Sequence, residues 1–298
     1  MMKLVMQEKD VKEHLKYKKW DFGFFGLPID DRGNEANLFI KDNCTNLVSL
    51  NYDADEMTLR LDNVDCLIDE LDEKFKFIEN KKILIEATTL TFAEILLTIK
   101  QAKIHNCYLT LLYLEPVSYS KKRTEFRVHK REFELSANTP GYKPIPGFIN
   151  SYLGDKTTKT IFIAGYESER INRGIEENSI STNQCSLVFG VPAFQVGWEM
   201  NSFANNIRVM KEQRISGDVY YSSANNPGST FDVLEKIYHS LNKNEELFVA
   251  PVGPKPAGIA VALFIVENND VSVYYDHPTK KPTRSVKVKK WHLYEVNF

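Results

Sequence analysis

The sequence has no apolar run that approaches the roughly 18 consecutive residues of a membrane-spanning helix. Residues 1–20 contain no apolar stretch followed by small residues, so a secretory signal is not expected. None of the four cysteines belongs to a Cys-x-x-Cys pair, which would be needed to place two thiolates on one zinc ion. We therefore expect a cytoplasmic chain with reduced cysteines, no membrane contact and no metal ion.

The sequence also lacks the common catalytic signatures. It contains no HExxH, no GxSxG, no GxxxxGK[ST] and no complete GxGxxG fingerprint. The candidate for acid–base catalysis is His277 beside Asp276, which follows a predicted strand. The alternative is a surface histidine without a chemical role. No feature of the sequence names a cofactor, and whether the chain is an enzyme stays open.

The net charge is small, because 38 Lys and Arg residues face 40 Asp and Glu residues. A field of one sign around the whole protein, of the kind that coats nucleic acid, is therefore excluded, and any basic site must be local. Basic residues gather at 121–131 and at 280–290. Each stretch is either a solvated charged face or a surface for phosphates or nucleic acid.

What the sequence does contain is an alternation of apolar strands and amphipathic helices. Helical spacing of apolar residues appears at 91–102, 231–241 and 256–266. The predicted strands are 21–25, 47–51, 83–87, 108–114, 160–164, 186–190, 219–222, 247–251, 271–275 and 292–296. Most of these runs are continuously apolar, as in parallel strands covered on both faces. We predict an α/β fold of the doubly wound class, in which ligands bind outside the carboxyl ends of the strands.

The chain looks like two copies of one plan, residues 1–118 and 159–298, joined by a basic, proline-rich linker or hairpin at 119–158. In each copy the first strand is followed by a glycine and then by a loop that reads acid, Arg, any residue, Asn. The strand and helix at 219–241 have no partner in the first copy. We expect two Rossmann-like halves in a pseudo-twofold arrangement, with mainly parallel sheets that face one ligand cleft. The loop pattern falls on Asp31, Arg32 and Asn34, and again on Glu169, Arg170 and Asn172.

Several side chains are candidates for binding a ligand in that cleft. The two arginines are suited to a bidentate grip on a phosphate or carboxylate, unless each pairs with the acid beside it. Thr88 and Thr89 follow a predicted strand, where their hydroxyls face a ligand or cap the next helix. Phe194 and Trp198 could stack on a base, although aromatic residues in such stretches more often pack in a core. Asn225 adds a polar loop at the same edge.

The sharpest local pattern is Gly253-Pro254-Lys255-Pro256, between a buried strand and a helix. Its glycine lets the backbone approach a ligand, and the amides of the helix amino terminus, with Lys255, favour an anion. The alternative is an ordinary strand-to-helix turn with a solvated lysine. Residues 251–278 resemble the carboxyl-terminal part of CRISPR-associated Rossmann-fold (CARF) sensor domains, which often show Gly-Gly-Thr-Lys-Pro at this turn. Gly253, Lys255 and Pro256 match that pattern, whereas Pro254 lacks the threonine hydroxyl.

The resemblance implies a function. CARF domains, and the related SAVED domains with two such units in one chain, bind cyclic oligonucleotides at a dimeric or pseudo-dimeric cleft. By resemblance, this chain would bind a nucleotide or another anionic small molecule as a sensing module in prokaryotic defence signalling, with a protein partner in a defence complex. Two other functions stay open: an enzyme that acts on a phosphorylated small molecule or nucleotide through Asp276, His277 and Lys255, and an interaction subunit whose arm at 121–131 docks a partner or nucleic acid.

Overall fold

The structure is a computed structural model that describes residues 2–124, 127–149 and 156–298. The chain folds as two compact units. Unit 1 comprises Met1–Tyr119 and Pro282–Phe298, and unit 2 comprises Ser120–Lys281. These boundaries differ from the expected halves, because the last 17 residues belong to unit 1 instead of unit 2. No helix in the described ranges is long and apolar enough to cross a bilayer.

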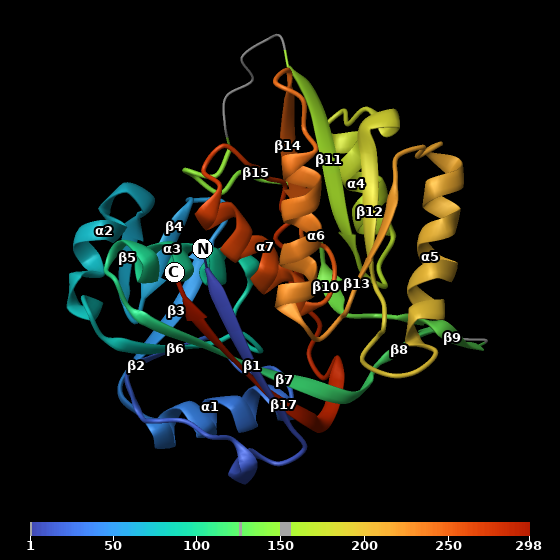
Figure 1. The fold of residues 1–298 in the computed structure, drawn as a ribbon. Coiled ribbons are helices and arrows are strands. Elements are labelled where there is room, and N and C mark those ends of the chain that lie inside the picture. The colour runs from blue at the N-terminus through green and yellow to red at the C-terminus, as the bar shows by residue number, and fades with distance from the viewer. Residues whose placement is uncertain (1, 125–126, 150–155) are drawn as a thin grey trace. The chain divides into compact units, whose positions relative to one another are not determined.

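Unit 1 is built on an eight-stranded mixed sheet, in the order β1-β17-β7-β6-β2-β3-β4-β5. Its four inner strands, β7, β6, β2 and β3, are parallel, whereas the outer strands on both sides are antiparallel. The helices α1 and α3 lie on opposite faces of this sheet (Figure 1). The strands are β1 (Lys3–Lys9), β2 (Trp20–Phe25), β3 (Cys44–Asp53), β4 (Thr58–Leu61), β5 (Val64–Leu67), β6 (Lys82–Glu86), β7 (Tyr108–Tyr119) and β17 (Ser285–Asn297). The helices are η1 (Lys12–His14), α1 (Asp31–Asn43), η2 (Ile68–Glu70), α2 (Leu71–Lys74), η3 (Lys76–Ile78) and α3 (Phe92–Ile104).

Local sequence signals explain the two main helices of unit 1. Thr91 and Glu94 form a capping box at the start of α3, and the apolar spacing predicted for this helix is confirmed. The start of α1 contradicts our expectation, since the pattern at 31–34 forms its first turn instead of a loop. Asp30 causes this by accepting a hydrogen bond of 3.0 Å from the Gly33 amide as the N-cap residue.

Unit 2 contains a five-stranded parallel sheet in the order β13-β12-β11-β14-β15. The helices α4 and α5 cover one face, and α6 and α7 cover the other (Figure 1). The strands are β8 (Lys121–Thr124), β9 (Arg127–Phe133), β10 (Ser136–Asn138), β11 (Thr157–Ala164), β12 (Cys185–Gly190), β13 (Val219–Ser222), β14 (Glu245–Ala250), β15 (Ser272–Val273) and β16 (Thr279–Lys280). The helices are α4 (Glu169–Glu177), η4 (Thr182–Gln184), α5 (Trp198–Glu212), α6 (Pro227–His239) and α7 (Lys255–Glu267).

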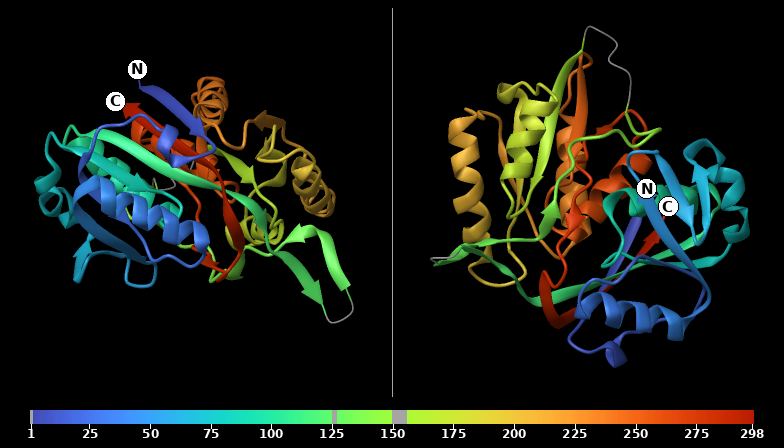
Figure 2. Two further views of the ribbon diagram at one scale, coloured as in Figure 1. Left: turned by 90° about the horizontal axis from the view of Figure 1, so that it is seen from below. Right: turned by 180° about the vertical axis from the view of Figure 1, so that it is seen from behind.

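The stretch expected to be a linker or hairpin contains β8 and β9, which pair antiparallel, and β10, which pairs with β16. The β8–β9 hairpin projects from the parallel sheet of unit 2 (Figure 2), and Phe133 at the end of β9 packs against Trp198 of α5. Residues 125–126 of the basic 121–131 arm lie outside the described residues.

The parallel strands of the two units follow one order. In unit 1 the chain forms β2, then β3 on one side of it, and then β6 and β7 on the other side. Unit 2 repeats this path with β11, then β12, and then β14 and β15. The extra strand β13 and helix α6 correspond to 219–241, for which the sequence shows no partner. The doubly wound α/β class is thus confirmed for the parallel part of each unit, while the pseudo-twofold arrangement stays a prediction.

Candidate functional site

Arg32 in unit 1 is buried, and its hydrogen bonds connect the first residue of β17 to β7. Its guanidinium donates to Ser285 Oγ at 2.7 Å and to the Leu114 carbonyl at 2.6 Å, and lies 3.6 Å from Asp30. Burial acts to raise the pKa of Asp30, but the charge of Arg32 and the hydrogen bonds from Ser285 and Gly33 outweigh it and lower that pKa. Arg32 therefore pairs with an acid, as our alternative expected, although the acid is Asp30 and not Asp31.

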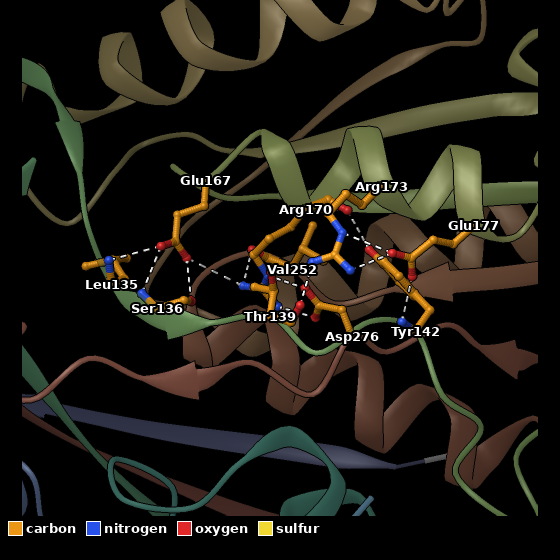
Figure 3. A network of polar contacts seen from close by, with 10 residues as sticks. All are labelled: Leu135, Ser136, Thr139, Tyr142, Glu167, Arg170, Arg173, Glu177, Val252 and Asp276. Carbon is orange, nitrogen blue, oxygen red and sulfur yellow. Dashed lines mark hydrogen bonds and ion pairs between the residues drawn. The ribbon is translucent and has the colours of Figure 1, made fainter. Parts of the chain in front are cut away.

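Arg170 in unit 2 also pairs with a carboxylate, and it lies on the first turn of α4, so the pattern at 169–172 forms a helix instead of the expected loop. It donates to both carboxylate oxygens of Asp276 at 2.6 Å each, and more weakly to the Val252 carbonyl at 3.4 Å (Figure 3). Burial acts to lower the pKa of Arg170, but Asp276 outweighs it and raises that pKa. Asp276 therefore serves as the counter-ion of Arg170. The expected partner, Glu169, is exposed instead.

The turns after β11 and β14 meet where the strand order of unit 2 reverses. A Cβ atom on Gly165 would lie 2.5 Å from the Val252 carbonyl oxygen, and one on Gly253 would lie 2.9 Å from the Ile163 carbonyl oxygen. Each glycine thus allows one backbone to approach the other, whereas we expected Gly253 to admit a ligand. Lys255 is the first residue of α7 and is half-buried.

His277 does not form a catalytic pair with Asp276 in this structure. Its ring nitrogen Nε2 lies 3.1 Å from the Lys143 carbonyl oxygen, and its ring lies edge-on to Tyr275. Burial lowers the pKa of His277. Since Asp276 is held by Arg170, these contacts position His277 as a neutral donor to a backbone carbonyl.

The threonines at the carboxyl end of β6 connect neighbouring strands. Thr89 Oγ1 accepts a hydrogen bond of 2.8 Å from the Gly26 amide and donates to the buried carboxylate of Glu86. Thr88 Oγ1 accepts from the Leu114 amide at 3.1 Å. Both hydroxyls are therefore used within unit 1, in a role that differs from the helix capping that we weighed against ligand binding.

The remaining predicted residues lie in several environments. Asp31 and Asn34 are exposed on the first turn of α1, and Asn225 is half-buried and accepts a bond from Ser223. Phe194 is buried, and Trp198 at the start of α5 contacts two other aromatic rings. Asn172 connects α4 to α5 through Gln213. Because Arg32 belongs to unit 1 and Arg170 and Lys255 belong to unit 2, a pocket shared by all three stays a prediction.

A polar pocket of about 630 Å³ lies at the carboxyl edge of the parallel sheet in unit 2. Its walls come from the segment around β9 and β10, from the turn between β11 and α4, and from α5. The lining residues are Lys122, Glu132, Phe133, Glu134, Ser136, Ala137, Asn138, Thr139, Tyr166, Glu167, Ser168, Glu169, Arg170, Ala204, Asn205 and Arg208.

A network of charged side chains fixes one wall of this pocket (Figure 3). Glu167 accepts hydrogen bonds from the amides of Leu135 and Ser136 at 3.0 and 2.8 Å, and from the Ser136 hydroxyl at 2.8 Å. On α4 itself, Arg173 donates to Thr139 and to Glu177. The segment that carries β10 is therefore attached by Arg173 to α4 and by Glu167 to the turn that precedes this helix.

The rings of Phe133 and Tyr166 form a second wall, and Trp198 contacts both of them without lining the pocket. Phe133 lies edge-on to Tyr166 with 4.8 Å between ring centroids, and 5.1 Å from Trp198. Tyr166 and Trp198 also meet edge-on. Sequence reasoning singled out Trp198 but missed Phe133 and Tyr166. A signal for Tyr166 existed, since it directly follows Gly165 at the end of a predicted strand.

Within the described ranges, no group of three or more His, Cys, Asp or Glu side chains could hold a metal ion. Among the four cysteines, Cys185 lies in unit 2, and burial raises the pKa of its thiol to about 12. A thiol with that pKa is protonated at neutral pH and is not a nucleophile.

No family model matches the chain, and no curated protein matches it. Among solved structures the chain is similar to a ketoreductase domain from the bacillaene assembly line, with a TM-score of 0.23 and 8% identity over 91% of this chain and 71% of that domain. A likeness of this degree carries no argument about activity.

Proposed function

We propose that the chain is a nucleotide-binding module and that the pocket of unit 2 holds the ligand. The observation that carries this proposal is the position of the pocket, at the carboxyl edge of a parallel sheet and against the turn that follows β11. Doubly wound sheets bind ligands at this edge. A volume of about 630 Å³ lies within the usual range for small-molecule sites.

Protein groups contact one another across the crevice at the reversal of strand order. The ion pair between Arg170 and Asp276 spans it, and the turns at Gly165 and Val252 touch. The pocket lies beside this crevice, on the face covered by α4 and α5. A ligand would therefore contact Tyr166 and α5 instead of the Gly253 turn.

The aromatic wall suits a nucleobase. Phe133 and Trp198 both contact Tyr166, so its ring is held in place before a ligand arrives. Stacking on such a ring is worth about 1–3 kcal/mol per base and tolerates any base. The wall therefore favours a ligand with a planar ring without selecting among bases.

The lining carries four acids and three bases, and Arg208 is the base to which we assign an anionic group. Most lining acids already have partners: Glu132 pairs with Lys122 at 3.3 Å, Glu134 pairs with Lys281, and Glu167 accepts the bonds described above. The side chain of Arg208 is 79% exposed and pairs with Glu212. Because an exposed pair of this kind contributes only about 0–1 kcal/mol, a phosphate can displace Glu212 at small cost.

A sensing role is the finer form of the proposal. The likeness of residues 251–278 to CARF domains favours a cyclic oligonucleotide as the ligand and a partner protein that responds to the bound state. The shared strand order of the two units supports the internal duplication on which a pseudo-twofold sensor depends. The enzyme alternative has less support, since Asp276 is bonded to Arg170 and His277 faces a carbonyl.

Thermal unfolding in the presence of mononucleotides, cyclic mononucleotides and cyclic dinucleotides tests the proposal. A ligand at about 100 times its Kd stabilises the folded state by about 2.7 kcal/mol, which raises the Tm by roughly 5–10 °C. We expect one of these nucleotides to produce such a shift. No shift with any of them at millimolar concentration contradicts the proposal.

Two single variants of α5 place the binding in the pocket. Arg208→Gln should weaken the ligand-induced shift, because it removes the cation that we assign to the anionic group. Lys211→Gln removes the same charge from an exposed residue of α5 that does not line the pocket, and should leave the shift unchanged. Equal effects of the two variants would place the ligand elsewhere.

A further inference from the structure

Unit 1 has a second pocket, of about 470 Å³, at the opposite edge of the parallel strands. The first residues of three strands line it: Trp20 of β2, Lys82 of β6 and Tyr108 of β7. The segment that precedes β2 contributes Lys16, Tyr17 and Lys18. This edge is not the one at which doubly wound sheets hold their ligands, so the site is separate from the proposed function.

The aromatic side chains of this pocket, Tyr17 and Trp20, are held by packing and by a hydrogen bond. Trp20 is 4% exposed, and its indole Nε1 donates to Thr110 Oγ1 at 3.0 Å. Tyr17 stacks on Trp20 with 5.0 Å between centroids. The side-chain amide of Gln7 bonds both the carbonyl and the amide of Lys16, at 2.7 and 2.9 Å. The backbone that carries the lysines is therefore held in place.

The rim is basic. Lys16, Lys18 and Lys82 are exposed, and none of them has an ion pair within the described part of the chain. Glu295 is the acid on the lining, and its carboxylate accepts a bond from Gln7. The lining itself therefore carries more positive than negative charge, while the acids Asp21, Asp42 and Glu13 lie next to lining residues.

Tyr108 supplies an exposed ring beside these lysines. Its side chain is 64% exposed, although it opens a strand whose following residues are buried. Exposed tyrosine next to lysine is the combination that proteins use to bind single strands, with bases stacked on rings and phosphates on ammonium groups. A duplex keeps its bases stacked on one another and cannot offer one to Tyr108.

We propose that this pocket binds single-stranded nucleic acid, with phosphates at Lys16, Lys18 and Lys82 and a base on Tyr108. A polyanion suits the site better than a single nucleotide does, because one exposed lysine contributes little to binding one phosphate. A strand contacts all three lysines together and releases counterions at each of them.

Fluorescence anisotropy with a labelled 12-nucleotide single strand tests this inference. For single strands, log K falls as log salt rises, and each phosphate contact makes this slope steeper by about 0.7. The triple variant K16Q/K18Q/K82Q should therefore show a slope that is shallower by about two. Tyr108→Ala should weaken binding about tenfold, whereas Tyr108→Phe retains the ring and should bind like the parent.

Matched controls make each outcome decisive. The variant K211Q/K236Q/K243Q removes three exposed lysines of unit 2 and should bind the strand as the parent does. The inference is overturned if the triple variant of unit 1 binds with unchanged slope, or if the unit 2 control loses as much. It is also overturned if a duplex of equal length, or thymidine monophosphate, binds as tightly as the single strand.

Discussion

The ion pair between Arg170 and Asp276 gives the sharpest stability prediction for unit 2. The side chain of Arg170 is 11% exposed and that of Asp276 is 2% exposed, with two bonds of 2.6 Å between them. Arg170→Met keeps much of the volume but leaves a buried carboxylate without its cation. Removal of one partner of a buried pair costs about 3–5 kcal/mol. We expect R170M to lower the free energy of unfolding of unit 2 by about 4 kcal/mol.

Variants of the partner residue test the same reasoning by the order of their effects. Asp276→Asn should cost less than R170M, because Arg170 keeps Glu167 at 3.9 Å and the Val252 carbonyl at 3.4 Å. The double variant R170M/D276N buries no charge at this position. It should therefore be more stable than R170M alone, a result that two independent losses would not give.

Alkylation of Cys185 across a urea titration measures the effect in unit 2. This thiol is buried in the folded unit, and reaction at Cys185 can be quantified on its own peptide by mass spectrometry. With a urea dependence of about 2 kcal/mol per M, R170M should shift the labelling midpoint by about 2 M. The matched control Arg208→Met breaks an exposed pair and should shift it by less than about 0.5 M. If R170M shifts the midpoint no further than the control, the ion pair does not stabilise unit 2 in the way we argue.

Three further predictions concern other positions. Thr89→Val should lower stability by about 1–3 kcal/mol in urea unfolding, because the buried Gly26 amide loses its acceptor; a neutral result contradicts this. Gly165→Ala should also cost about 1–3 kcal/mol, since its methyl group would meet the Val252 carbonyl, and an unchanged midpoint would show that the turn relaxes. Burial lowers the pKa of His277, so as the pH drops below about 6.5 the unfolded chain takes up a proton at this residue more readily than the folded chain, and stability falls. His277→Gln should reduce that loss of stability between about pH 7 and 5, measured by urea unfolding.

The sequence predicted the parallel strands well because their signal is local. The expected strand at 219–222 coincides with β13, and the other parallel strands were found to within a few residues at most ends, whereas the antiparallel strands β1, β4 and β5 were not predicted. Continuous apolar runs mark buried strands wherever they occur. The apolar helices at 91–102 and 256–266 were found for the same reason, and they correspond to α3 and α7.

The helix α1 was missed because its first turn resembles a loop. Asp31, Gly33 and Asn34 are typical turn residues, and this favoured a loop in sequence reasoning. The hydrogen bond from the Gly33 amide to the N-cap residue Asp30 stabilises a helix at this position. The last strand, β17, was predicted, but its place in unit 1 was not, because its partners β1 and β7 lie far away in the sequence.

The roles of the two arginines could not be predicted for a related reason. Each was given a ligand or the acid beside it as a partner, since sequence shows only neighbours. Arg32 bonds to Ser285, which is 253 residues away, in addition to its contact with nearby Asp30, and Arg170 bonds to Asp276, which is 106 residues away. Only the fold brings these groups together, just as only the fold places Phe133 against Tyr166.

The location of a bound nucleotide is the most direct test of the central claim. A crystal structure from crystals soaked with the nucleotide that raises the Tm most would show where this nucleotide binds. We predict density in the unit 2 pocket, with a base against Tyr166 and an anionic group within hydrogen-bonding distance of Arg208. Density elsewhere, with that pocket empty, would contradict the account.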